Sequence, residues 1–235
     1  MSVQELVRQW SIASSHRLND IESKQLLKEA GISVADTQVA KSADEAAAKA
    51  KALGLPVVLK PLSRQGVPAQ SPDGARVVAN TETEVRHAFD SVKKVAAQWD
   101  PASANEGVAV QKAVKPGVEL RLHVFQDPVL GAAIAFSFGR LGADIWEDMA
   151  YRIIPLNEKD ARLMLREPKA AKRYLQGYGM LPAPNAAQVE QALIKLSKLV
   201  DAHPDITDIE LDPAVAGREG MVVQEARVTL RAKQA

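Results

Sequence analysis

The 235-residue chain contains no cysteine, which excludes disulfide bonds, thiolate-bound metals and cysteine nucleophiles. It has no excess of one charge either: the net charge is +1 at pH 7, so nothing favours nucleic acid or an anionic membrane as a partner. No apolar run approaches the roughly 20 residues that span a membrane, and the amphipathic first residues, with Glu5 and Arg8, lack a signal-peptide pattern. We therefore expect a cytoplasmic protein with no nucleic-acid or membrane partner.

The periodicity of the remaining residues indicates a mixture of helices and strands. Because the two do not alternate strictly as βαβ units, a two-lobed α+β protein fits better than a doubly wound sheet. The patterns predict helices over residues 3–12, 21–30, 43–53, 81–98, 158–175 and 187–203, and strands over residues 32–40, 55–60, 75–78, 107–114, 118–125, 132–138, 206–215 and 221–230.

The C-terminal residues 206–230 have the alternation of a β-hairpin with one buried face. In the first strand, Asp208, Glu210 and Asp212 are two residues apart, so their carboxylates share one face of the pleat. Pro213 is expected to end this strand, because proline lacks the N–H that a ladder needs.

A turn over residues 216–220 and a second strand would return Glu225 to the acidic face. Several hard oxygen ligands converging on a small area suit Mg²⁺ better than a transition metal. The alternative interpretation is a solvent-facing strand that uses acids for solubility, because charge runs are usually solvated. His123, on the polar face of the strand 118–125, has no second histidine or acid at a ligand spacing, so we expect no metal role for it.

Lys60 ends the short apolar strand 55–60 and precedes a polar, glycine-containing loop, residues 61–74. In that position its ammonium group can contact a nucleotide phosphate. The alternative is an ordinary surface lysine whose ammonium stays in water. The loop is long enough for a functional flap, but it does not match the spacing of a P-loop.

Seven short motifs follow one another along the chain in a fixed order. They are Glu22-Ser-Lys-x-Leu-Leu-x-x-x-Gly-Ile-x-Val, Pro56-Val-Val-Leu-Lys60, Glu106-Gly-Val-x-Val-Gln-Lys112, Gly117-x-Glu119, Asp127-Pro128, Arg152-x-x-Pro-Leu and Glu210-x-Asp-Pro213. Together they resemble the ATP-grasp domain of ADP-forming acyl-CoA synthetases, of the acetate–CoA ligase β-subunit type, which is related to succinyl-CoA synthetase β. The resemblance covers about residues 16–230.

This resemblance implies a two-lobed ATP-grasp fold with the nucleotide cleft between the lobes. It divides the chain into an N-terminal arm (residues 1–15), an N-terminal lobe (16–112) and a C-terminal lobe (113–235) that contains the Mg²⁺-binding hairpin.

The resemblance also implies roles for individual residues. Lys60 matches the strand lysine that contacts phosphate, and Gln111 and Lys112 match the hinge strand that lines the adenine pocket. Glu119 falls at the position of the ribose-side acid. Arg152 matches a basic residue retained after the second glycine loop, and with Lys60 it would assist phosphoryl transfer.

The metal site implied by the resemblance consists of Asp212 and Glu225, with Glu210 beside them. Asp212 stands where the family usually has Asn, and Glu225 where it usually has Asp; both positions ligate Mg²⁺ in the family. The carboxylate at position 212 adds a negative charge, which either strengthens metal binding or repels phosphate.

Two loops depart from the family pattern. The family's flap normally carries a histidine that can be phosphorylated, and residues 67–74 contain none. In the second loop, residues 139–144, Arg140 replaces a glycine that lets backbone approach phosphate, and Asp144 replaces a longer acid. We therefore expect no two-histidine relay within this chain, and a histidine on a partner subunit would reach the nucleotide directly.

These features predict an acid–thiol ligase subunit that uses ATP and Mg²⁺. It would transfer phosphoryl between ATP and a histidine or an acyl phosphate on an α-type partner, and that partner would also supply the sites for CoA and a small carboxylic acid. The alternatives are a nucleotide-binding or regulatory subunit that has lost turnover, and a purely structural subunit. The acyl substrate and the choice between ATP and GTP stay open.

Overall fold

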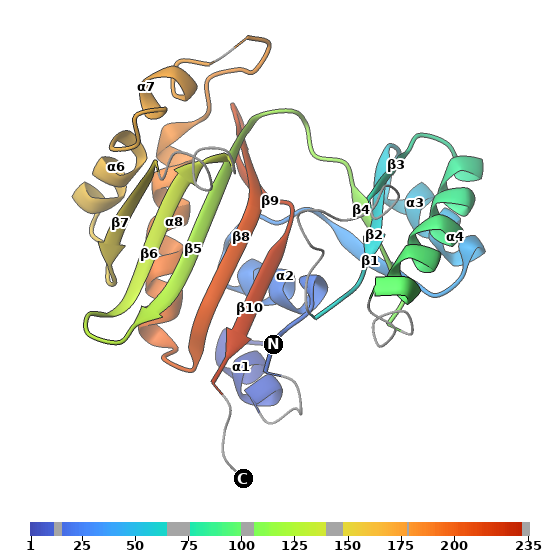
Figure 1. Ribbon diagram of the computed structural model, residues 1–235, viewed down its shortest axis with the longest axis horizontal. Coiled ribbons are helices and arrows are strands. Elements are labelled where there is room, and N and C mark those ends of the chain that lie inside the picture. Colours follow the sequence, from blue (N-terminus) through green and yellow to red (C-terminus); the bar gives the residue numbers. More distant parts are fainter. Residues whose placement is uncertain (12–15, 65–75, 100–105, 140–147, 178, 232–235) are drawn as a thin grey trace. The chain divides into compact units, whose positions relative to one another are not determined.

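The chain forms two compact units in the computed structural model, which describes residues 1–11, 16–64, 76–99, 106–139, 148–177 and 179–231 (Figure 1). The larger unit consists of Met1–Leu18, Glu22–Val34 and Lys115–Ala235, and the smaller unit of Asn19–Ile21 and Ala35–Val114. No helix of the described residues is long and apolar enough to cross a membrane.

The smaller unit is a four-stranded antiparallel sheet packed against two helices. The strand order is β1 (Thr37–Ala40), β4 (Val108–Lys112), β2 (Val57–Pro61), β3 (Val77–Ala79), and the helices are α3 (Ala43–Leu53) and α4 (Glu82–Trp99). Ser42 caps α3 by accepting a hydrogen bond from the Glu45 N–H, as its Ser-x-x-Glu sequence predicts. The buried side chains of Val57 and Leu59 pack against the helices in a core of their own.

The larger unit is built on a six-stranded antiparallel sheet. Its order is β10 (Ala226–Leu230), β8 (Ile206–Gly217), β5 (Val118–Asp127), β6 (Gly131–Phe138) and β7 (Met149–Ile153), and β9 (Gly220–Val223) pairs with β8. Its helices are α1 (Val3–Ser11), α2 (Asp20–Glu29, whose first residues belong to the smaller unit), α6 (Glu158–Arg166), α7 (Ala171–Tyr174) and α8 (Ala186–Ala202).

One face of this sheet forms the core of the larger unit. Alternate side chains of β5 from Val118 to Val124 are buried there, and Leu122 is the ladder partner of the buried Phe136 of β6. Leu193 and Leu196 of α8 belong to the same cluster, and Figure 1 shows α8 lying behind the strands. The opposite face of β5 and β8 carries polar side chains, as expected for strands that bury only one face.

Most of the predicted elements are present, with several differences. The strand predicted over residues 221–230 is divided into β9 and β10, and β7 was not predicted. The helix predicted over residues 158–175 is split into α6 and α7, because Pro168 lies between them and proline cannot continue a helical hydrogen-bond ladder. Residues 32–35 form only an isolated bridge, from Val34 to Val223, and no regular strand. The prediction that Pro213 ends its strand is wrong, since β8 continues to Gly217.

The division into units also differs from the lobe boundaries expected from the sequence. Residues 22–34 were expected in the N-terminal lobe, but they belong to the larger unit. The cause is packing: Leu26, Leu27 and Ile32 are buried in the core of the larger sheet, and the Val223 N–H donates to the Ser33 carbonyl. Leu6 and Val7 of the N-terminal arm are buried in the same core.

Candidate nucleotide and metal site

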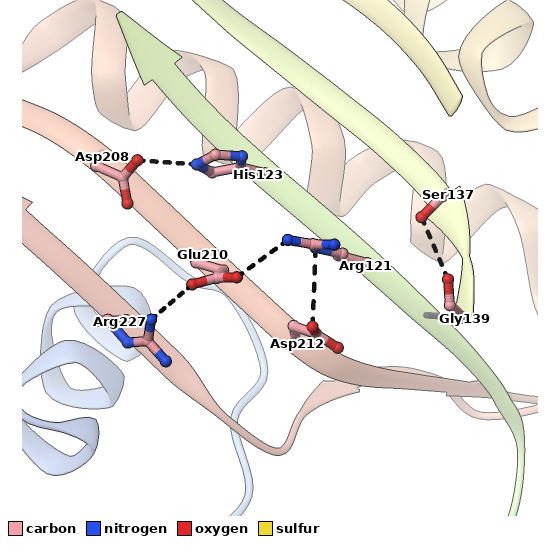
Figure 2. Close-up of polar contacts among 8 residues, drawn as sticks. All are labelled: Arg121, His123, Ser137, Gly139, Asp208, Glu210, Asp212 and Arg227. Carbon is pink, nitrogen blue, oxygen red and sulfur yellow. Dashed lines mark hydrogen bonds and ion pairs between the residues drawn. The ribbon is translucent and has the colours of Figure 1, made fainter. Parts of the chain in front are cut away.

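Charged side chains gather on the polar face of the larger sheet, where β5, β8 and β10 lie side by side (Figure 2). They come from alternate positions of the three strands, which brings residues about 90 positions apart in the sequence into contact. We call this set the charged ladder; it consists of Arg121, His123, Asp208, Glu210, Asp212 and Arg227. The expected sharing of one face by the three acids of β8 is confirmed by the register.

A β-bulge shapes the ladder around Arg121. Leu120 pairs with Ala214, whereas Leu122 pairs with Leu211, so β8 carries one extra residue in this interval and the register shifts there. Asp212 and Pro213 therefore both lie opposite Arg121. A bulge accommodates proline because the extra residue leaves the ladder locally unpaired, which explains why Pro213 does not end the strand.

Glu210 is held between two arginines. Its Oε1 lies 3.3 Å from an Nη of Arg121, and its Oε2 accepts a hydrogen bond of 2.8 Å from an Nη of Arg227. Both carboxylate oxygens are thus engaged by guanidinium groups, which bind carboxylates with fixed geometry. An acid in this position neutralises its neighbours and is poorly placed to ligate a metal ion.

The two other acids of the ladder each have a basic partner from β5. Asp212 Oδ2 lies 3.7 Å from Nε of Arg121, and the Asp212 side chain is only 10% exposed. Asp208 Oδ2 lies 2.8 Å from Nε2 of His123, whose ring also contacts Phe125. Arginines therefore balance Glu210 and Asp212, and His123 is hydrogen-bonded to Asp208, which the alternative interpretation of a purely solvated acidic face does not describe.

Glu225 lies on the returning chain between β9 and β10. The pairing of β10 with β8 ends at Ala226 and Leu211, and the pairing of β9 with β8 resumes at Val223 and Ala214. Between these two points the Asp212 N–H donates to the Glu225 carbonyl (3.3 Å), and the Gln224 N–H donates to the Pro213 carbonyl (3.0 Å). The backbone of Glu225 is thus beside that of Asp212, and a shared metal role of their carboxylates stays a prediction.

The donor set of this pair fits Mg²⁺. In nucleotide sites Mg²⁺ is usually held by one or two carboxylates together with phosphate oxygens and water, and not by a complete protein cage. Among the residues that the structure describes, no three His, Cys, Asp or Glu side chains form a group that could hold a metal ion. Asp212 and Glu225 are therefore the candidate ligands, whereas Glu210 does not fit, because the arginines occupy it.

Lys60 ends β2 in the smaller unit, and its side chain is only 3% exposed. Its ammonium group lies 2.9 Å from Oδ2 of Asp20, at the first residue of α2. The alternative of a solvated surface lysine is therefore wrong. The phosphate contact stays a prediction, and it would require the ammonium to be shared with, or released from, Asp20.

The remaining predicted cofactor residues lie in both units. In the smaller unit Gln111 is buried on β4, where its Oε1 accepts a 3.5 Å hydrogen bond from the Thr37 hydroxyl, and Lys112 is exposed at the end of the same strand. In the larger unit Glu119 is exposed on β5, paired with Val215 and two residues before Arg121. The ribose and adenine roles stay predictions.

Arg152 is not brought together with the acidic residues of β8. It pairs with Ile134 in the ladder between β7 and β6, and Ile134 is fully buried on the core face. Side chains alternate along a strand, so Arg152 projects to that same side, away from the charged ladder. Its guanidinium is bound by Glu167 (2.6 Å) and by the Tyr151 carbonyl, which gives it a structural role at the end of α6.

The two loops that depart from the family pattern, residues 67–74 and 140–144, lie outside the described residues. Immediately before the second loop, the buried Ser137 hydroxyl donates a 3.4 Å hydrogen bond to the Gly139 carbonyl (Figure 2). The expectation drawn from the missing flap histidine therefore stays a prediction.

Arg121 and Arg227 are the site residues that the sequence interpretation missed. The alternation of residues 118–125 and 226–230 already placed both on polar faces. The missing information was the pairing of β5 and β10 with the two edges of β8, which sets the arginines beside Glu210.

A model of the ATP-grasp domain family matches residues 10–230, which is nearly the whole chain. The chain belongs to the ATP-grasp family. It is 36% identical over 217 residues to the β subunit of ADP-forming acetate–CoA ligase II from Pyrococcus furiosus, covering 90% of this chain and 91% of that protein. It is also 32% identical to ADP-forming acetate–CoA ligase I from Archaeoglobus fulgidus. That alignment covers 93% of this chain and 32% of the length of the Archaeoglobus protein.

Solved structures of this ATP-grasp group have the same fold. An acetyl-coenzyme A synthetase from Candidatus Korarchaeum cryptofilum, in complex with coenzyme A and Ca-AMPCP, matches with a TM-score of 0.91 and 31% identity over 98% of this chain and 100% of that chain. A further structure of that synthetase, described with Mg-AMPPCP and with a phosphohistidine segment pointing towards the nucleotide-binding site, matches with a TM-score of 0.83 and 28% identity over the same shares. The expected α+β ATP-grasp fold is thus confirmed.

Proposed function

We propose that this ATP-grasp chain is the nucleotide-binding β-type subunit of an ADP-forming acyl-CoA synthetase. It transfers a phosphoryl group between ATP and a histidine, or an acyl phosphate, that a partner subunit carries. The observation that carries the proposal is the charged ladder, with the backbone of Glu225 hydrogen-bonded to that of Asp212, in a chain that aligns over nine-tenths of its length with an acetate–CoA ligase β subunit.

Asp212 and Glu225 would hold Mg²⁺, which supplies charge neutralisation at the phosphoryl oxygens when it is bound. Their carboxylates are hard oxygen ligands, and the backbone of the two residues is joined by the hydrogen bond from the Asp212 N–H to the Glu225 carbonyl. Lys60 would contact a phosphate oxygen with its ammonium group, and its burial places that contact in a setting where electrostatic interactions are strong. Gln111, Lys112 and Glu119 keep their predicted roles toward adenine and ribose.

A partner subunit completes the reaction in this proposal. The Pyrococcus furiosus relative is a β subunit by name, and the Archaeoglobus fulgidus relative contains the equivalent of this chain in about a third of its length. The missing flap histidine makes a partner-borne histidine the natural phosphoryl carrier, and the Korarchaeum protein is described with a phosphohistidine segment that points towards its nucleotide-binding site. We propose that the partner also binds CoA and a small carboxylic acid, and that both subunits are cytoplasmic, in keeping with a chain without cysteine.

The test is isotope exchange between ADP and ATP with the α-type partner present. The proposal predicts exchange that depends on Mg²⁺ and is lost in Glu225→Ala. Asp208→Asn is the matched control, because Asp208 lies on the same strand face and is paired with His123, outside the proposed metal pair. Nucleotide binding without any exchange would refute the catalytic role and indicate a subunit that has lost turnover.

A further inference from the structure

Four charges of alternating sign cross three strands of the charged ladder in one row. They are, in order, Arg227 on β10, Glu210 on β8, Arg121 on β5 and Asp212 on β8 (Figure 2). The N–O distances between successive members are 2.8, 3.3 and 3.7 Å. Each charge in the row therefore lies next to a charge of opposite sign. The row ends at Asp212, one of the two proposed metal ligands, so the ion pairs bear on metal binding as well as on stability.

Arg121 is the member of the row that touches Asp212. An Nη of its guanidinium lies within hydrogen-bond distance of Glu210 (3.3 Å), whereas Nε lies 3.7 Å from Oδ2 of Asp212, an attraction of opposite charges without a hydrogen bond. The side chains of Arg121 and Asp212 are only 21% and 10% exposed, so water screens this pair less than a surface ion pair. Lysine, with a single point charge, has no equivalent of this fork.

The bulge in β8 is what makes the contact possible. Because Asp212 and Pro213 together lie opposite Arg121, the arginine faces Asp212, while Glu210 is directly opposite His123 and is reached by Arg121 on the diagonal. Glu210 is in turn anchored by Arg227 from the other side. Glu210, which does not fit the metal site, thus holds Arg121, and Arg121 in turn lies beside the proposed ligand Asp212.

We propose that Arg121 is a positioning residue for the metal-binding carboxylate of Asp212 and is itself held by Glu210. The inference rests on the proposed Mg²⁺–nucleotide function of this site. Arg121 engages Oδ2 of Asp212 and so sets the orientation of the carboxylate before a metal arrives. Groups that orient a metal ligand in this way commonly change metal affinity 10- to 100-fold when they are removed.

The experiment measures binding of ADP by calorimetry at a series of Mg²⁺ concentrations, for the unmutated chain and for Arg121→Gln and Arg121→Lys. The expected result is a rise in the half-saturating Mg²⁺ concentration of about tenfold for both variants. Arg227→Gln is the matched control, because Arg227 bonds Glu210 but not Asp212; it should change the value by less than about threefold. The electron paramagnetic resonance spectrum of Mn²⁺ bound with ADP should broaden in Arg121→Gln, because its ligand is no longer held in one orientation.

The possible outcomes separate the two proposals. If the unmutated chain binds no ADP in the presence of Mg²⁺, the proposed function fails and this inference fails with it. If it binds ADP but the Mg²⁺ dependence is the same in Arg121→Gln, the inference alone is overturned. Tighter Mg²⁺ binding in Arg121→Gln would also overturn it, since Arg121 would then act as a competing cation. A general loss of stability would be recognised because it lowers ADP binding equally at every Mg²⁺ concentration. If Arg121→Gln does not fold, Arg121→Lys provides the same test.

Discussion

Replacing Asp20 with asparagine should destabilise the smaller unit more than removing an exposed ion pair from the same unit does. Lys60 is 3% exposed and Asp20 15% exposed, and their charged atoms are 2.9 Å apart. Removing one partner of a buried pair typically costs about 3–5 kcal/mol, because the remaining charge is left without compensation. Since Asp20 is in part solvated, we expect about 2–3 kcal/mol for Asp20→Asn.

Hydrogen–deuterium exchange of the peptides that contain β2 and β4 is the appropriate assay, because it reports on the smaller unit by itself. A loss of 2–3 kcal/mol corresponds to exchange roughly 30- to 150-fold faster for amides that exchange by opening of this sheet. Asp44→Asn is the matched control in the same unit: its ion pair with Arg86 has side chains 89% and 44% exposed, and such pairs contribute less than about 1 kcal/mol.

Lys60→Met extends the same test. It removes the more buried of the two charges, and the Asp20 carboxylate that remains is more exposed to water, so it should cost less than Asp20→Asn. Equal protection in Asp20→Asn and Asp44→Asn would refute the reasoning, because the pair would then behave as a solvated one. A larger loss in Lys60→Met than in Asp20→Asn would also contradict it.

Two further predictions concern β5. Gly117→Ala should destabilise the larger unit by about 1–3 kcal/mol in thermal unfolding, because an added Cβ would lie 2.5 Å from the Ala216 carbonyl oxygen and force the backbone to shift; an unchanged melting temperature would contradict this. At the other end of the strand, the backbone N–H groups of Leu130 and Val129 lower the pKa of Asp127 below its usual value. A lowered pKa in the folded state means that this contribution to stability is present above the unfolded-state pKa and is lost as the pH falls through the folded one. An NMR titration of Asp127 that gives an ordinary aspartate pKa would rule this out.

The local pattern of the sequence was enough to predict most strands of the larger sheet and the shared face of Asp208, Glu210 and Asp212. Period-two alternation is a property of each strand alone, so it can be recognised in the sequence without knowing which strands are neighbours. The capping sequence at Ser42 was readable for the same reason, since its partner Glu45 is three residues away.

What the sequence did not reveal depends on contacts between distant segments. Glu210 looked like a third metal ligand until the pairing of β5 and β10 with β8 placed arginines on both of its oxygens. Arg152 looked like a phosphate ligand until the register with β6 placed it on the core face beside Glu167. The bulge opposite Arg121 was hidden as well, because Pro213 by itself is equally compatible with the end of a strand.

The charge balance of the ladder also answers the question raised by a carboxylate at position 212. Arg121 offsets the charge of Asp212, and Arg227 with Arg121 offsets that of Glu210, so the face as a whole is less acidic than the strand Ile206–Gly217 alone. An anionic nucleotide approaching this face therefore meets paired charges. This supports a site for a metal–nucleotide complex over a face that would repel phosphate.

Binding of Mg·ATP, measured by calorimetry, tests the central claim most directly. We expect saturable binding to the unmutated chain that is abolished without Mg²⁺ and weakened at least tenfold by Asp212→Ala, which removes one of two proposed ligands. Asp208→Asn, on the same strand face, should bind as the unmutated chain does. Absence of Mg·ATP binding by the unmutated chain, or equal binding by Asp212→Ala, would contradict the assignment of this sheet face as the metal–nucleotide site.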